Sequence, residues 1–174
     1  MKYLVKQRLF CLGDDFAIKN EDGEELFYVD GKAFTLLRQK LAFLDAKKKE
    51  VAFIREKLIS LTPSFEILRE GEVAAVVKKD FINLFRLGFT VDVPGPDDLE
   101  ATGSLLDHEY TFRRGDRVVA QVSKQWFSLL DTYGVEIAPG EDDVLVLAST
   151  VVIDMIAHPD AKPAPKPAAP PDEG

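Results

Sequence analysis

The side chains best suited to binding a ligand are basic residues on short predicted strands. Arg55 and Lys57 alternate along one expected strand, and Lys78 and Lys79 end another. Guanidinium and ammonium groups bind phosphate through charge and hydrogen bonds. If these strands meet on one side of the fold, the four residues predict a site for anionic lipid head groups. Alternatively, they are ordinary solubilising charges, offset by 30 carboxylates.

The two histidines are the next candidates for chemistry. His108 lies between Asp107 and Glu109, which together resemble a metal-binding group. Successive residues of an extended chain point to opposite faces, so these three cannot converge on one ion. We therefore expect His108 in a turn or at the start of a strand. We expect His158 at the end of a helix, where Asp154 lies one turn earlier and can pair with it.

Recognisable catalytic and metal-binding motifs are missing. The sequence contains no GxSxG, Walker loop, HExxH or GxGxxG. An EF-hand frame on the acidic segment around Gly23 would place Ile18 and Val29 at ligand positions, which excludes it. Cys11 is the single cysteine, so an intrachain disulfide and a Cys-rich zinc site are excluded as well. We expect no catalytic residues, no metal, no cofactor and no enzymatic activity.

Composition indicates one globular domain. Of the 174 residues, 46% are hydrophobic and 30% charged, and the formal net charge is −8. This negative charge disfavours nucleic acid, which binds mainly through basic residues that neutralise phosphates. No secretory leader is expected, because Lys6 and Arg8 interrupt the first apolar run, and no transmembrane span is expected either. A cytoplasmic location follows as the default.

One long apolar segment, residues 142–158, predicts a buried helix. Between Asp143 and Asp154 it has no charge, and its apolar residues cover every side of a helical wheel. It is too short for an unassisted bilayer span and too long for an ordinary strand. Asp142 or Asp143 can cap its start, and Pro159 ends it. We place a domain at 1–158 and an extended, solvated Pro/Ala-rich tail at 159–174.

The remainder predicts about a dozen strands, because turn signals recur every 8 to 12 residues. A hairpin is expected around Asn20–Gly23, a turn at Asp30–Gly31 and a strand over Val51–Ile59. A dozen strands closed into a barrel leave a lumen that must be filled, and a central helix can fill it. The predicted fold is therefore mainly β: a closed antiparallel barrel around a buried C-terminal helix.

The sequence resembles the LURP-one-related family. The resemblance rests on YLVKQRLF, ELFYVDGK and FIREKLISLTPSFEI in the first half, and on FTVDVPGPDDLEATGSLLDHEYTF in the second. Its most specific part runs from Trp126 through Val135 into the apolar helix. The family's fold is similar to the tubby C-terminal domain, a twelve-stranded barrel threaded by a hydrophobic helix, and phospholipid scramblases belong to the same broad superfamily. The resemblance implies this fold but no particular activity.

The leading hypothesis is a non-enzymatic cytoplasmic module that binds membrane phospholipid or phosphoinositide head groups through Arg55, Lys57, Lys78 and Lys79. One alternative is a scaffold with a protein partner. A second is a small enzyme with a site at the barrel rim, which predicts a deep pocket with convergent polar groups. A third is a scramblase-like protein, in which the apolar segment Val144–Ile153 enters a bilayer.

Overall fold

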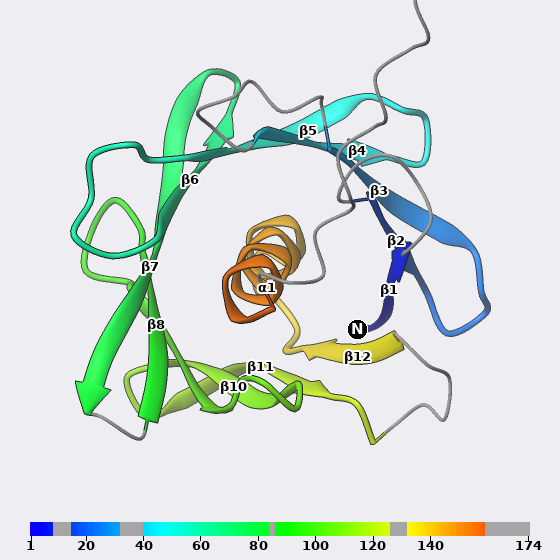
Figure 1. Cartoon of the computed structure of the whole chain (residues 1–174). Coiled ribbons are helices and arrows are strands. Elements are labelled where there is room, and N and C mark those ends of the chain that lie inside the picture. Colours follow the sequence, from blue (N-terminus) through cyan, green and yellow to red (C-terminus); the bar gives the residue numbers. More distant parts are fainter. Residues whose placement is uncertain (9–14, 32–39, 84–85, 126–131, 159–174) are drawn as a thin grey trace, which may run out of the picture.

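The computed structural model describes residues 1–8, 15–31, 40–83, 86–125 and 132–158, which form a closed barrel around one helix (Figure 1). Within these ranges, twelve antiparallel strands pair in sequence order, and β1 closes on β12. The strands are β1 Lys2–Arg8, β2 Asp15–Lys19, β3 Glu25–Gly31, β4 Lys40–Asp45, β5 Glu50–Glu56, β6 Ser64–Arg69, β7 Glu72–Asn83, β8 Arg86–Asp92, β9 Leu99–Ser104, β10 Glu109–Arg114, β11 Arg117–Ser123 and β12 Thr132–Ile137. The predicted fold class is confirmed.

The described residues do not include Cys11, Trp126 or the Pro/Ala-rich segment 159–174. The boundary predicted at residue 158 therefore stays a prediction.

The helix α1, Asp143–Ala157, runs through the barrel and fills its interior (Figure 1). Leu147, Thr150 and Val152 are completely buried although they lie on different sides of the helix. The lining strands bury alternate side chains, the largest of which include Phe43, Phe89 and Phe112. Among the described residues, no helix has the length and apolarity that crossing a membrane requires.

Three consecutive acidic residues fix the start of α1 to three parts of the barrel. Glu141 pairs with Arg114 of β10 at 2.8 Å and with Arg117 of β11. Asp142 receives two 2.6 Å hydrogen bonds from Arg69 at the end of β6. Asp143 accepts a 2.6 Å hydrogen bond from the Tyr3 hydroxyl of β1. We call this rim the Asp142 end; the opposite rim, where α1 finishes, is the His108 end.

Asp142→Ala is expected to destabilise the fold by about 2 kcal/mol, because Asp142 is also the N-cap and accepts a 3.1 Å hydrogen bond from the Leu145 amide. Burial raises the pKa of Asp142, but hydrogen bonds from Arg69 and the Leu145 amide outweigh burial and lower this pKa below 3.8. The Asp142 contribution is therefore present above pH 3.8 and is lost as the pH falls through the lowered pKa.

Urea denaturation of the wild type and Asp142→Ala at pH 7 and at pH 3 measures this contribution. We expect the difference in unfolding free energy to shrink at the lower pH. Asp116→Ala, a change in the β10–β11 turn at the same rim, is the matched control and should be nearly neutral at both values. An equal loss at both pH values would show that the carboxylate charge plays no part.

Two local predictions were wrong. The turn predicted at Asp30–Gly31 is absent, because both residues remain paired in β3 opposite Ala42 and Leu41 of β4. The strand predicted over Val51–Ile59 ends early, since β5 finishes at Glu56. The hairpin at Asn20–Gly23 is confirmed: Gly23 has a φ of 82° and its amide donates to the Asn20 carbonyl.

Candidate functional site

The connection between β5 and β6, residues 57–63, carries large apolar side chains into solvent, and we call it the apolar loop. Leu58 is 56% exposed, Ile59 is 95% exposed and Leu61 is fully exposed. Because β6 ends at Arg69 beside the start of α1, its beginning and the apolar loop lie at the His108 end. Contiguous exposed apolar residues of this kind are typical of an interaction surface.

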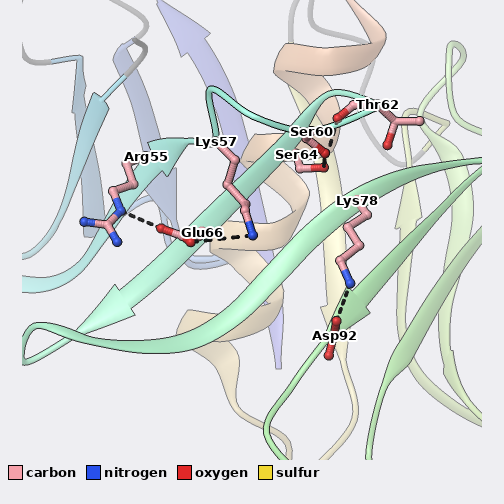
Figure 2. Close-up of polar contacts among 8 residues, drawn as sticks. All are labelled: Arg55, Lys57, Ser60, Thr62, Ser64, Glu66, Lys78 and Asp92. Carbon is pink, nitrogen blue, oxygen red and sulfur yellow. Dashed lines mark hydrogen bonds and ion pairs between the residues drawn. The ribbon is translucent and has the colours of Figure 1, made fainter.

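Short-range hydrogen bonds hold the apolar loop in shape. The Lys57 amide donates to the Ser64 carbonyl at 2.8 Å, which closes the base of the loop. The Ser60 and Ser64 hydroxyls are 2.9 Å apart, and the Ser64 hydroxyl donates to the Thr62 carbonyl at 3.0 Å (Figure 2). The polar groups of the loop therefore form hydrogen bonds with one another, while its two leucine side chains and its isoleucine side chain are exposed to solvent.

Three of the four predicted basic residues lie on the outer face of adjacent strands beside the apolar loop. Ile54 points into the core, so Arg55 and Lys57 point outward from the other face of the chain. Lys78 lies opposite Ser64, which is itself the cross-strand neighbour of Lys57. Figure 2 shows the three side chains over β5, β6 and β7. We call Arg55, Lys57 and Lys78 the basic face.

Lys79 does not join this group. As the residue after Lys78 on β7, it points to the opposite face, the side on which Val77 is buried. Its amide donates to the Pro63 carbonyl at 3.3 Å, so its backbone supports the base of the apolar loop. The structure thus brings together Arg55, Lys57 and Lys78 and separates Lys79 from them.

Carboxylates partly neutralise the basic face. Glu66 accepts a 2.6 Å hydrogen bond from Arg55 and lies 3.8 Å from the Lys57 ammonium. Asp92 pairs with Lys78 (Figure 2). These three cations therefore form ion pairs with two carboxylates. The three cations are 36–42% exposed, and ion pairs of such partly exposed cations are weak and can exchange for another anion.

A second group of polar residues lies at the same rim, between the end of α1 and the β9–β10 turn. His108 Nε2 lies 2.5 Å from Asp154 Oδ1, and His158 Nδ1 lies 3.2 Å from the same oxygen. Only 3% of the Asp154 side chain is exposed. The His108 ring stacks on the His158 ring at 4.7 Å and on the Tyr133 ring at 4.4 Å. We call Asp154, His108 and His158 the His–Asp–His cluster.

Electrostatics in the His–Asp–His cluster favour a charged carboxylate. Burial raises the pKa of Asp154, but the hydrogen bonds from His108 and His158 outweigh it and lower this pKa. The hydrogen bond to Asp154 is the main cause that raises the pKa of His158 to about 9. Burial, aided by the negative charge of Asp154, raises the pKa of Tyr110 and Tyr133 well above 10. Asp154 is therefore an anion that these imidazoles compensate.

Sequence reasoning found part of this cluster. The predicted pairing of Asp154 with His158 and the predicted placement of His108 at a turn are confirmed. Asp107 accepts a hydrogen bond from Ser104 and Glu109 from Ser123, so these neighbours point away from His108, as predicted. The contact between His108 and Asp154 was missed, because it joins residues 46 positions apart and no local pattern signals it.

A surface cleft of about 560 Å³ lies elsewhere. It is lined by Lys49, Glu50, Val51, Ala52, Phe53, Leu68, Glu70 and Gly71. The β4–β5 and β6–β7 turns in this lining belong to the Asp142 end, so the cleft shares no residue with the apolar loop or the His–Asp–His cluster.

The fold defines a class: a closed twelve-stranded antiparallel barrel with a buried C-terminal helix. The chain belongs to the LURP-one-related family, whose model matches residues 1–154. It is similar to a protein of Bacillus subtilis (strain 168), "Uncharacterized protein YxjI", with 31% identity over 160 residues that cover 92% of this chain and 96% of that protein.

Its fold is also similar to the X-ray structure of an Arabidopsis thaliana protein, with a TM-score of 0.63 and 20% identity over 88% of this chain and 90% of that one. At this identity the likeness shows the fold alone.

Proposed function

We propose that this protein is a non-enzymatic binding module that docks on anionic phospholipid surfaces with the His108 end facing the membrane. The observation that carries the proposal is the apolar loop, whose Leu58, Ile59 and Leu61 lie in solvent in the segment that follows Lys57 of the basic face. Apolar side chains that enter the head-group region, flanked by Lys and Arg that contact lipid phosphates, are the two elements of peripheral membrane binding.

The apolar loop should contribute more of the binding energy than the basic face. Burying a Leu or Ile side chain completely is worth roughly 1.5–3 kcal/mol. Each Lys or Arg near an anionic surface adds about 1 kcal/mol. The net charge of −8 opposes approach over most of the protein surface. We therefore expect moderate, salt-sensitive binding in one orientation, with lipid phosphates taking the places of Glu66 and Asp92 as partners of the basic face.

Tubby domains, whose fold is similar to that of the LURP-one-related family, bind phosphoinositide head groups through basic residues, and the proposal extends this mode of binding to the basic face by analogy alone. A cytoplasmic location, where the facing leaflet carries anionic lipids, is part of the proposal. The same loop would serve a protein partner if lipid binding failed, and such a scaffold role is the alternative.

Co-sedimentation with liposomes tests the proposal. Wild-type protein is mixed with neutral phosphatidylcholine vesicles, with vesicles that also contain phosphatidylserine, and with vesicles that contain phosphoinositide, each at low and high salt. We expect binding to both anionic vesicles, weakened by salt. Ile59→Ser combined with Leu61→Ser should reduce binding about 10-fold or more, because both side chains are exposed and support no core contact. Lys57→Gln combined with Lys78→Gln should reduce binding and its salt dependence.

Matched controls change the same residue types elsewhere. Val118→Ser alters an exposed apolar residue of β11, and Lys47→Gln alters a lysine of the β4–β5 turn at the Asp142 end. Both should bind like the wild type. Equal losses in the control and test variants, or no binding to any vesicle, would refute membrane docking and leave the scaffold role.

A further inference from the structure

We propose that the His–Asp–His cluster is a binding site for a divalent transition-metal ion of the Zn²⁺ type, with Asp154 Oδ1, His108 Nε2 and His158 Nδ1 as its ligands. This proposal is independent of membrane docking. It rests on the convergence of one ligand atom from each residue, all within 4.8 Å of one another. The chain contains two histidines, and both present a ring nitrogen to the same buried oxygen.

The donor types select the metal class. Two imidazole nitrogens and one carboxylate oxygen suit Zn²⁺ and the neighbouring late first-row ions. Mg²⁺ and Ca²⁺ prefer sites built entirely from oxygen, so we expect them to bind poorly. Three protein ligands also leave a fourth position of a tetrahedral ion for water or another small ligand.

Of the ligand-atom separations, the one between Asp154 and His158 is near that of a formed site. Bonds of about 2.0–2.2 Å at tetrahedral angles place two ligand atoms about 3.3–3.6 Å apart. The observed distances from Asp154 Oδ1 are 2.5 Å to His108 Nε2 and 3.2 Å to His158 Nδ1. The two imidazole rings, which are stacked nearly parallel, would rotate out of this stack so that both lone pairs converge on the ion. Asp154 itself needs no movement, because α1 holds it against the barrel.

The groups around the ligands orient them for this role. His158 Nε2 lies 3.0 Å from the Leu106 carbonyl and donates its proton there, so the ion would displace only the Nδ1 proton, which bonds to Asp154. A backbone carbonyl that receives the second ring N–H is a common support of metal-binding histidines. Stacking on Tyr133 packs the His108 ring against β12. His108 has a φ of 54°, a left-handed conformation that is uncommon outside glycine, and lies in the turn that brings its ring to Asp154.

Burial gives the site its driving force. A buried carboxylate is costly unless it is paired, and the Asp154 side chain is almost completely enclosed. A dication would compensate this charge more fully than an imidazolium can. The partly exposed His158 gives the ion a route from solvent, since 29% of its side chain is accessible.

Titration of the EDTA-treated full chain, without an affinity tag, with Co²⁺ tests the proposal. We expect one Co²⁺ per chain with visible d–d absorption, displaced by Zn²⁺ and unaffected by Mg²⁺. His108→Gln and His158→Gln should each weaken binding by at least about 100-fold, since even changes to residues that support ligands cost 10–100-fold. Zn²⁺ should raise the melting temperature of the wild type but not of these variants.

Two controls make the result decisive. Asp107→Asn changes an acidic neighbour of His108 that points away from the cluster and should bind Co²⁺ like the wild type. Circular dichroism confirms that each variant is folded, and Asp154→Asn provides a third ligand change if one histidine variant is not. Co²⁺ binding that survives in folded His108→Gln and His158→Gln, or no d–d absorption in the wild type at millimolar Co²⁺, would overturn the proposal.

Discussion

Leu147→Ala is expected to lower the free energy of unfolding by roughly 3–5 kcal/mol, the upper part of the range for buried leucines. Leu147 is completely buried in α1, which contacts strands on several sides of the barrel, including β5, β7 and β12. Because a closed barrel has fixed strand pairing, its wall cannot collapse easily into the space that the side chain leaves. The cavity should therefore persist and contribute to the cost.

Urea denaturation followed by circular dichroism measures this loss, and Leu106→Ala is the matched control. The control makes the same chemical change at Leu106, which lies in the β9–β10 turn and is 56% exposed. We expect the control to stay within about 0.5 kcal/mol of the wild type. A small loss for Leu147→Ala would mean that the barrel relaxes around the helix, contrary to the packing described here.

Gly103→Ala is expected to cost about 3 kcal/mol or more and to disturb the His–Asp–His cluster as well. Gly103 has a φ of 140°, and an added Cβ would lie 2.5 Å from the Glu109 carbonyl oxygen and 2.7 Å from the Tyr110 Cα. These are backbone atoms of the paired strand β10, so β9 and β10 must move apart. The turn between them carries His108, whose hydrogen bond to Asp154 should lengthen.

Gly71→Ala separates the two causes of strain. Gly71 also has a positive φ, of 86°, but an added Cβ would meet no atom within 4 Å. Its cost should be about 1 kcal/mol, from backbone conformation alone. Thermal unfolding compares the two variants, and the histidine ring resonances of the NMR spectrum report on the cluster. Equal costs would contradict the close approach of β9 and β10.

The fold was predictable because its information is local. Turn residues with positive φ, such as Gly23, punctuate the strands, and the uncharged run between Asp143 and Asp154 identifies the buried helix without any contact being known. The turn predicted at Asp30 and Gly31 was wrong because that prediction, too, used local information. Their residue types are typical of a turn, but both residues stay paired because β4 continues the ladder. Cross-strand pairing overrides local preference there.

The candidate sites were less predictable, because they depend on positions that local patterns do not specify. Leu58 and Ile59 continue the apolar pattern of β5, and such a pattern normally indicates burial. The predicted strand therefore included these two residues, although both lie in solvent. Arg55 and Lys57 were correctly placed on one face, but their shared partner Glu66 lies on the next strand. The approach of His108 to Asp154 exists only after the barrel closes around α1.

The pairing of β1 with β12 has a consequence for how the protein folds. Tyr3 lies opposite Val135, so the first strand has no partner on one side until the chain has grown by more than 130 residues. Contacts over such sequence separations slow folding, since the chain must be confined before they form. The core is completed later still, by a helix that the ribosome makes after all twelve strands. Nascent chains should therefore hold an open, partly hydrophobic sheet that depends on chaperones until α1 emerges.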